Sequence, residues 1–109
     1  MNQPKIIKRI PTENQILFME SDINYTIIHL SDGKKLISGY NIKFFEQRAD
    51  NEQFMRVNKS FLINKSFIRS VNFTQNLACI TLKNDENVVV SRRKLKVLRV
   101  LHPTLFEII

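Results

Sequence analysis

The chain has 109 residues, of which 43% are hydrophobic and 25% charged, which predicts one globular domain and excludes a disordered tail. No apolar run approaches the ~20 residues that cross a bilayer, so we expect neither a membrane span nor a membrane partner. The amino-terminal residues lack the apolar block of a secretory signal. A single cysteine, Cys79, can form no internal disulfide, and we therefore expect a cytoplasmic protein.

The net charge of +7 is concentrated in one half of the chain. Residues 1–52 contain seven Lys and Arg and seven Asp and Glu, which cancel. Residues 53–109 contain ten Lys and Arg against three Asp and Glu. A polyanion-binding surface requires such one-sided charge, because each neutralised phosphate releases condensed counterions and adds affinity. Charge alone does not separate DNA from RNA or an acidic lipid.

Short segments with alternating or continuous apolar residues recur along the chain and predict a mainly β fold. The predicted strands are Lys5–Ile10, Ile16–Glu20, Tyr25–Leu30, Lys34–Ser38, Ile68–Phe73, Leu77–Lys83 and Asn87–Ser91. Turn-forming residues separate them, for example at 31–33 and 84–87, which indicates antiparallel hairpins.

Two segments have helical spacing instead. Asn41–Ala49 predicts a short helix, because its apolar residues cluster at helical intervals and no turn residue interrupts them. Ser91–Leu101 predicts a second helix, with Ser91 as N-cap and Pro103 beyond its end. Its predicted apolar face repeats every three residues, at Leu95, Leu98 and Leu101.

The beginning of the second predicted helix is basic. Arg92, Arg93 and Lys94 follow Ser91 at the positive end of the helix dipole, where acidic residues are normally favoured. Three cations there require an anion, which a phosphate backbone supplies, and Arg can also read guanine bidentately. A solvated basic face is the alternative interpretation.

In a second basic segment, Phe54–Lys65, apolar positions alternate with polar ones, and Asn58, Lys59 and Ser60 form a polar break inside it. Asn pairs with adenine, Lys with guanine or phosphate, and Ser with phosphate, so these side chains suit a DNA-reading loop. An ordinary turn is the alternative interpretation of the tripeptide.

Motifs for catalysis or metal binding are missing from the sequence. It has no Gly-rich phosphate loop and no nucleophile elbow, and Cys79 lies in a predicted strand without an activating base. His29 and His102 have no partner at metal-ligand spacing, and we expect both to be structural or surface residues. The sequence thus predicts neither an enzyme nor a cofactor.

Six phenylalanines could form a base-stacking platform for single-stranded nucleic acid. Most are interleaved with aliphatic residues, which favours core packing instead. They are Phe44, Phe45, Phe54, Phe61, Phe67 and Phe73.

The order of these features resembles the LytTR DNA-binding domain family from about Ile10 to Leu101. The similar pieces are Phe18–Ser21, Tyr25–Gly33, the first helix, Phe54–Asn64 and Val90–Arg93. The Arg-Val-x-x-Ser-x-x-x-Asn and Ser-Arg-Arg pieces are specific in this order.

The resemblance implies an elongated arrangement of small antiparallel sheets with one or two short helices. It also implies bacterial transcription control by a member of the response regulators of two-component systems. Such domains present loops to two successive major grooves and the intervening minor groove. The chain has no room for a receiver domain, which leaves a separate signalling partner as an expectation.

The resemblance also assigns residues to the interface. Asn24, Asn58, Lys59 and Arg93 match base-contacting positions, although relatives often have a His-Arg or similar pair where this chain has Asn58-Lys59. The backbone contacts implied are Ser60, Ser91, Arg92, Lys94 and Lys96.

The leading hypothesis is sequence-specific binding of double-stranded DNA by two domains, forming a homodimer on repeated half-sites. An RNA or single-stranded nucleic-acid module is the first alternative. A basic module that binds an acidic protein is the second.

Overall fold

A computed structural model describes residues 15–74 and 77–106, which form eight strands, two α-helices and a short 3-10 helix at Lys65–Phe67. The strands are β1 (Ile16–Asp22), β2 (Tyr25–Leu30), β3 (Lys35–Ser38), β4 (Phe54–Arg56), β5 (Phe61–Asn64), β6 (Ile68–Thr74), β7 (Leu77–Leu82) and β8 (Asn87–Val90). The helices are α2 (Ile42–Arg48) and α3 (Arg92–Leu101). The strand predicted at Lys5–Ile10 lies outside the described residues.

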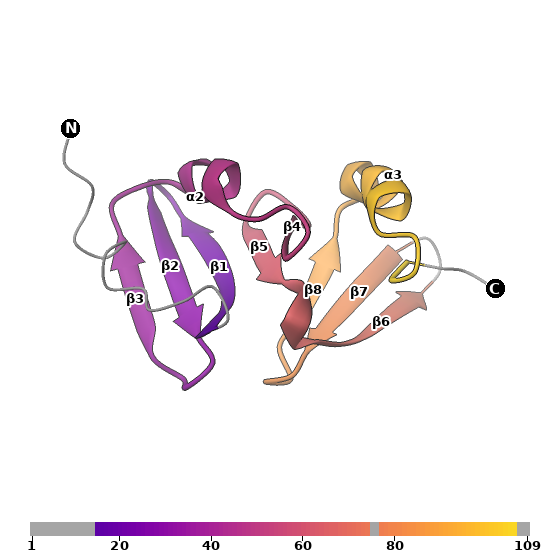
Figure 1. Ribbon diagram of the computed structural model, residues 1–109, viewed down its shortest axis with the longest axis horizontal. Coiled ribbons are helices and arrows are strands. Elements are labelled where there is room, and N and C mark those ends of the chain that lie inside the picture. The colour runs from indigo at the N-terminus through magenta and orange to yellow at the C-terminus, as the bar shows by residue number, and fades with distance from the viewer. Residues whose placement is uncertain (1–14, 75–76, 107–109) are drawn as a thin grey trace.

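The strands form two antiparallel sheets (Figure 1), which confirms the predicted fold class. The first sheet has the order β3-β2-β1-β5-β4, and the second has the order β6-β7-β8. Within the first sheet, Asp22 pairs with Tyr25 at the end of the β1–β2 hairpin, and Glu20 pairs with Phe61 of β5. The molecule measures 47 × 26 × 23 Å, so the expected elongated shape is also confirmed.

Strand β1 is buried on both faces. Leu17 and Phe18 belong to one hydrophobic core, which lies between the two sheets and α3. Ile16 and Met19 belong to a second core under α2. A strand between two cores has no solvent-facing side, and its first four residues therefore form a continuous apolar run instead of alternating.

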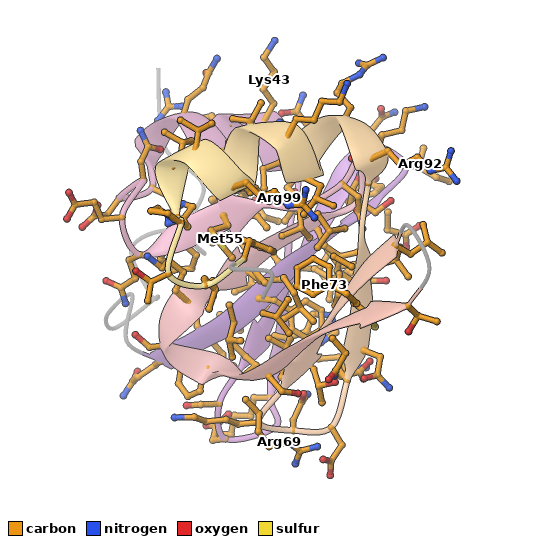
Figure 2. The ribbon with its side chains drawn as sticks, turned by 90° about the vertical axis from the view of Figure 1, so that its right-hand side faces the viewer. Lys43, Met55, Arg69, Phe73, Arg92 and Arg99 are labelled. Atoms are coloured by element: carbon orange, nitrogen blue, oxygen red, sulfur yellow. The ribbon has the colours of Figure 1, made fainter. Side chains whose placement is uncertain are left out.

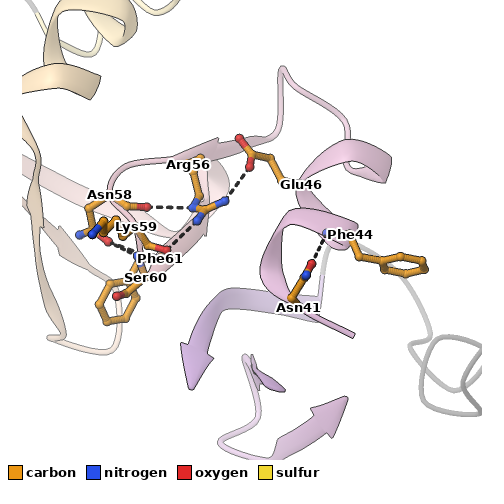
Figure 3. A network of polar contacts seen from close by, with 8 residues as sticks. All are labelled: Asn41, Phe44, Glu46, Arg56, Asn58, Lys59, Ser60 and Phe61. Carbon is orange, nitrogen blue, oxygen red and sulfur yellow. Dashed lines mark hydrogen bonds and ion pairs between the residues drawn. The ribbon is translucent and has the colours of Figure 1, made fainter. Parts of the chain in front are cut away.

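Helix α2 covers the second core, and its predicted position is confirmed within one residue at each end. The side chain of Asn41 caps it by accepting a hydrogen bond of 3.0 Å from the backbone N–H of Phe44 (Figure 3). Ile42 and Phe45 are buried, whereas Lys43 points into solvent (Figure 2).

Helix α3 packs on the other core through Leu95 and Leu98. The prediction that Leu101 shares this face is wrong, because Leu101 is 63% exposed. Each three-residue step turns a helix by about 300°, so Leu101 lies about 120° away from Leu95. Phe106, beyond the helix, is buried in the same core, and the sequence analysis did not predict it.

All eight phenylalanines are described by the structure, and each is buried or half-buried. Of the six considered as a stacking platform, Phe45 and Phe54 lie in the core under α2, and the other four pack against one of the two cores. The expectation of core packing is therefore confirmed, and the side chains offer no exposed phenylalanine for stacking on bases.

Candidate nucleic-acid interface

The three segments that the sequence singled out lie in a row. The β1–β2 turn is next to the β4–β5 loop, because the backbone N–H of Ser21 donates to the carbonyl of Ser60 at 2.8 Å. The β4–β5 loop is next to the start of α3, because the N–H of Ser91 donates to the carbonyl of Val57 at 3.0 Å. Strand β5 correspondingly lies between the β1–β2 hairpin and β8 in Figure 1. Residues far apart in sequence thus form one continuous edge.

The β4–β5 loop is shaped from within by Asn58 (Figure 3). Its Oδ1 accepts hydrogen bonds from the backbone N–H groups of Ser60 at 2.7 Å and Phe61 at 3.0 Å. Its Nδ2 donates to the carbonyl of Val89 in β8 at 2.7 Å. One amide hydrogen of Asn58 is left for an outside partner. The loop is therefore held to the second sheet while Lys59, at its tip, is exposed.

Arg56 also holds the β4–β5 loop in shape, a role that the sequence analysis missed. Its guanidinium donates to the carbonyls of Asn58 at 2.8 Å and Lys59 at 2.6 Å. The same group forms an ion pair of 2.6 Å with Glu46 of α2 (Figure 3), and the Arg56 side chain is only 17% exposed. The planar fork of Arg suits three partners at once. The signal available in the sequence was a cation, Arg56, placed between the apolar residues Met55 and Val57.

Ser91 is the N-cap of α3, as predicted. The Oγ of Ser91 accepts from the backbone N–H of Lys94 at 3.2 Å, and the first turn contains no acidic residue. Arg92 and Arg93 are exposed and Lys94 is half-buried, so three cations surround the positive helix end. Figure 2 shows Arg92 extending away from the end of α3. Lys96, in the next part of the helix, is also exposed.

The loop and the helix start enclose a shallow hollow of about 420 Å³. Its walls contain four cationic side chains, one amide and one hydroxyl, and no carboxylate. They are Arg56, Asn58, Lys59, Ser91, Arg93 and Lys94. Five of the nine residues assigned to the interface from the sequence meet here. A site of this composition is suited to an anion with hydrogen-bond acceptors, such as a phosphate or a guanine edge.

The remaining assigned residues lie outside the hollow. Asn24 is exposed in the β1–β2 turn, at the other end of the row. Ser60 is half-buried at the base of the β4–β5 loop, and Arg92 and Lys96 are exposed on α3. For all nine assigned residues, contact with DNA remains a prediction.

The two histidines have protein partners. His29 lies 2.9 Å from Glu20 and stacks on Phe18 with ring centroids 4.1 Å apart. The Nδ1 of His102 accepts from the Lys65 ammonium at 3.0 Å, which requires a neutral ring because an ammonium group can only donate. Burial lowers the pKa of His102, the charge of Lys65 lowers it further, and Glu52 opposes both. Both histidines are structural, as expected.

Within residues 15–74 and 77–106, no group of three His, Cys, Asp or Glu side chains is arranged to hold a metal ion. Over the same described residues, no helix is long and apolar enough to cross a membrane. Cys79 is half-buried in β7 and unpaired.

Comparisons with known proteins agree with this geometry. The chain is similar in structure to the LytTr DNA-binding domain of a methyl-accepting/DNA response regulator from Bacillus cereus, with 21% identity, a TM-score of 0.74 and 81% of each chain covered. At this identity the likeness establishes the fold alone. No curated protein sequence gave a match. A family model described as the LytTr DNA-binding domain matches residues 6–102, nearly the whole sequence. The chain therefore belongs to the family of LytTr DNA-binding domains, which act in transcription regulation.

Proposed function

We propose that this chain binds double-stranded DNA sequence-specifically, in the cytoplasm of a bacterium, and regulates transcription from the bound sites. The observation that carries the proposal is the cationic hollow, where Lys59 of the β4–β5 loop and Arg93 of α3 line one recess. Both side chains are exposed and can reach base edges, where Lys and Arg favour guanine. Asn24, at the far end of the row, contacts a further base.

The remaining residues of the interface contact the DNA backbone. Arg92, Lys94 and Lys96 donate to phosphates next to the start of α3. The hydroxyl of Ser91 can also donate to a phosphate, since its oxygen is already an acceptor for the Lys94 N–H. Ser60 has the same role at the loop. Asn58 offers one amide hydrogen to a base while its other polar atoms keep the loop in shape.

The dimensions of the molecule suit a site longer than one groove. Its long axis of 47 Å exceeds the ~34 Å between successive major grooves on one face of the duplex. In this proposal the row of three segments faces two successive major grooves and the minor groove between them. Two domains on repeated half-sites form the dimer, and a separate protein supplies the signal.

The test begins with selection of bound duplexes from a random pool at ~150 mM salt, which screens loose charge attraction. The expected result is an enriched motif repeated at about one helical turn. A single-stranded pool competing in the same reaction should not displace the duplex. Displacement by the single strand, or the absence of any enriched motif, would contradict the proposal.

Salt dependence then tests the backbone contacts. Three phosphate-neutralising cations, Arg92, Lys94 and Lys96, should give log K a slope of about −3 per domain against log salt, since each contributes ~0.9. Lys96→Gln should reduce the slope by about 1. Lys83→Gln is the matched control, because Lys83 is exposed at the β7–β8 turn, at the opposite end of β8 from α3. Equal slopes for the two variants would argue against the backbone role of Lys96.

A further inference from the structure

Ile23, the first residue of the β1–β2 turn, is the most exposed large apolar side chain among the described residues, at 87%. Its φ angle is +57°, in the left-handed region that β-branched residues rarely adopt. Asp22 and Tyr25 pair across the turn, so only Ile23 and Asn24 lie at its tip. A positive φ at the first of two tip residues is typical of type II′ turns, where Gly is favoured. Both the exposure and the conformation of Ile23 are unfavourable for the isolated fold.

The other turns within residues 15–74 and 77–106 do not have this mismatch. Among the described residues, positive φ angles occur only at Ile23, Asp85 and Gly33. Gly33 has no Cβ and adopts its φ of 92° freely, and Asp tolerates the left-handed region better than most residues. Gly and Asp, which tolerate a positive φ, thus occupy two of these three turn positions, whereas the β-branched Ile23 occupies the third. A strained, exposed side chain that the fold does not use points to a use outside the fold.

The position of Ile23 indicates what that use is. The turn lies beside the β4–β5 loop through the Ser21 to Ser60 hydrogen bond, at the end of the row that contains Asn24. The hairpin end, residues 20–25, contains two carboxylates and no Lys or Arg, so it is poorly suited to phosphate contact. It is better suited to base edges, among which only thymine presents an apolar group, its 5-methyl, in the major groove.

We propose that Ile23 contacts the 5-methyl group of a thymine in the major groove and so determines specificity at one base pair. The inference rests on the proposed function. Ile23 packs its branched side chain against the methyl, while Asn24 donates or accepts hydrogen bonds at an adjacent base. Ile23 is exposed in the free protein because the surface against which it packs belongs to the DNA.

The test replaces each thymine of the selected duplex by uracil, which removes only the 5-methyl group and keeps the base pairing. Wild-type protein should lose about fourfold in affinity at one thymine, the factor expected for one buried methyl. Ile23→Gly should bind the unmodified duplex about fourfold more weakly and should be insensitive to uracil at that same position. The unfolding midpoint of Ile23→Gly should not be lowered, since Gly relieves the positive φ.

Ile37→Ala is the matched control, because Ile37 is also β-branched and 68% exposed but lies on the edge strand β3. It should keep the wild-type response to uracil. The inference is overturned if no thymine position is sensitive, if Ile23→Gly keeps the sensitivity, or if Ile37→Ala also loses it. A protein that selects no duplex at all overturns the proposed function itself, which distinguishes the two failures.

Discussion

Replacement of Arg56 by Lys tests whether the β4–β5 loop is positioned from within the protein. The Arg56 guanidinium joins the carbonyls of Asn58 and Lys59 to the carboxylate of Glu46 through three hydrogen bonds of 2.6–2.8 Å. A Lys side chain keeps the charge but cannot reproduce the planar fork, and we expect two of the three bonds to be lost.

The expected effect on stability follows from these bonds. A hydrogen bond to a charged group contributes about 1.5–3 kcal/mol, and we take the lower end because the Glu46 side chain is 34% exposed. The free energy of unfolding should therefore fall by about 3 kcal/mol, measured by urea denaturation. Arg69→Lys is the control, since Arg69 and its partner Asp85 are 54% and 75% exposed. It should change stability by less than about 0.5 kcal/mol.

The effect on binding separates a positioning role from direct contact. Arg56→Lys should lower affinity for the selected duplex and leave affinity for random DNA and the salt slope nearly unchanged, because the net charge is the same. The ratio of specific to random affinity is the right measure, since partial unfolding reduces both equally. An unchanged ratio would refute the reasoning, because it would mean that the loop reads DNA without the support of Arg56.

Three further predictions concern α3 and its ends. Arg93→Ala should cost about 1–3 kcal/mol of discrimination at one base pair, whereas Lys96→Ala should weaken all sequences alike, as measured on a panel of single-base duplex variants. Ser91→Ala should lower the free energy of unfolding by about 0.5–2 kcal/mol in chemical denaturation, because the Lys94 N–H loses its cap. The lowered pKa of His102 means that the unfolded chain binds its proton first, so stability should fall as the pH drops below about 6.5. Denaturation curves at pH 7.5 and 5.5 should differ less in His102→Gln than in wild type.

Local sequence patterns predicted the hairpins and both helices because those elements depend on neighbours in the chain. Strands β4 and β5 were recognised only as a buried segment, since they have three and four residues and flank a polar break. Their strand character comes from pairing with each other and with β1, about 40 residues earlier. A pattern confined to a short window does not contain that pairing.

The candidate site shows the same division. Residue type and charge pointed to Lys59 and Arg93, because a concentration of cations in one half of the chain can be recognised without a structure. The tasks of Arg56 and Asn58 were not visible, since their partners are backbone carbonyls and N–H groups whose positions depend on the fold. Asn58 has a side chain suited to adenine, yet three of its hydrogen bonds are made inside the protein. Polar residues of one loop thus divide between shaping the loop and facing its ligand.

The first turn of α3 should be more stable with an acidic residue than with the cations it has. Arg92→Glu places a carboxylate at the positive end of the helix dipole, next to two remaining cations, and should raise the free energy of unfolding by about 0.3–1 kcal/mol. It should also weaken binding to specific and random DNA, because a phosphate contact becomes a repulsion. Arg99→Glu is the control on the same helix: its charge lies in the last turn, where the dipole favours cations, so it should destabilise the protein. Stabilisation by Arg92→Glu with undiminished DNA affinity would contradict the backbone contact assigned to Arg92. Stabilisation with weakened binding would show that the free protein tolerates an unfavourable helix start because DNA supplies the missing anion.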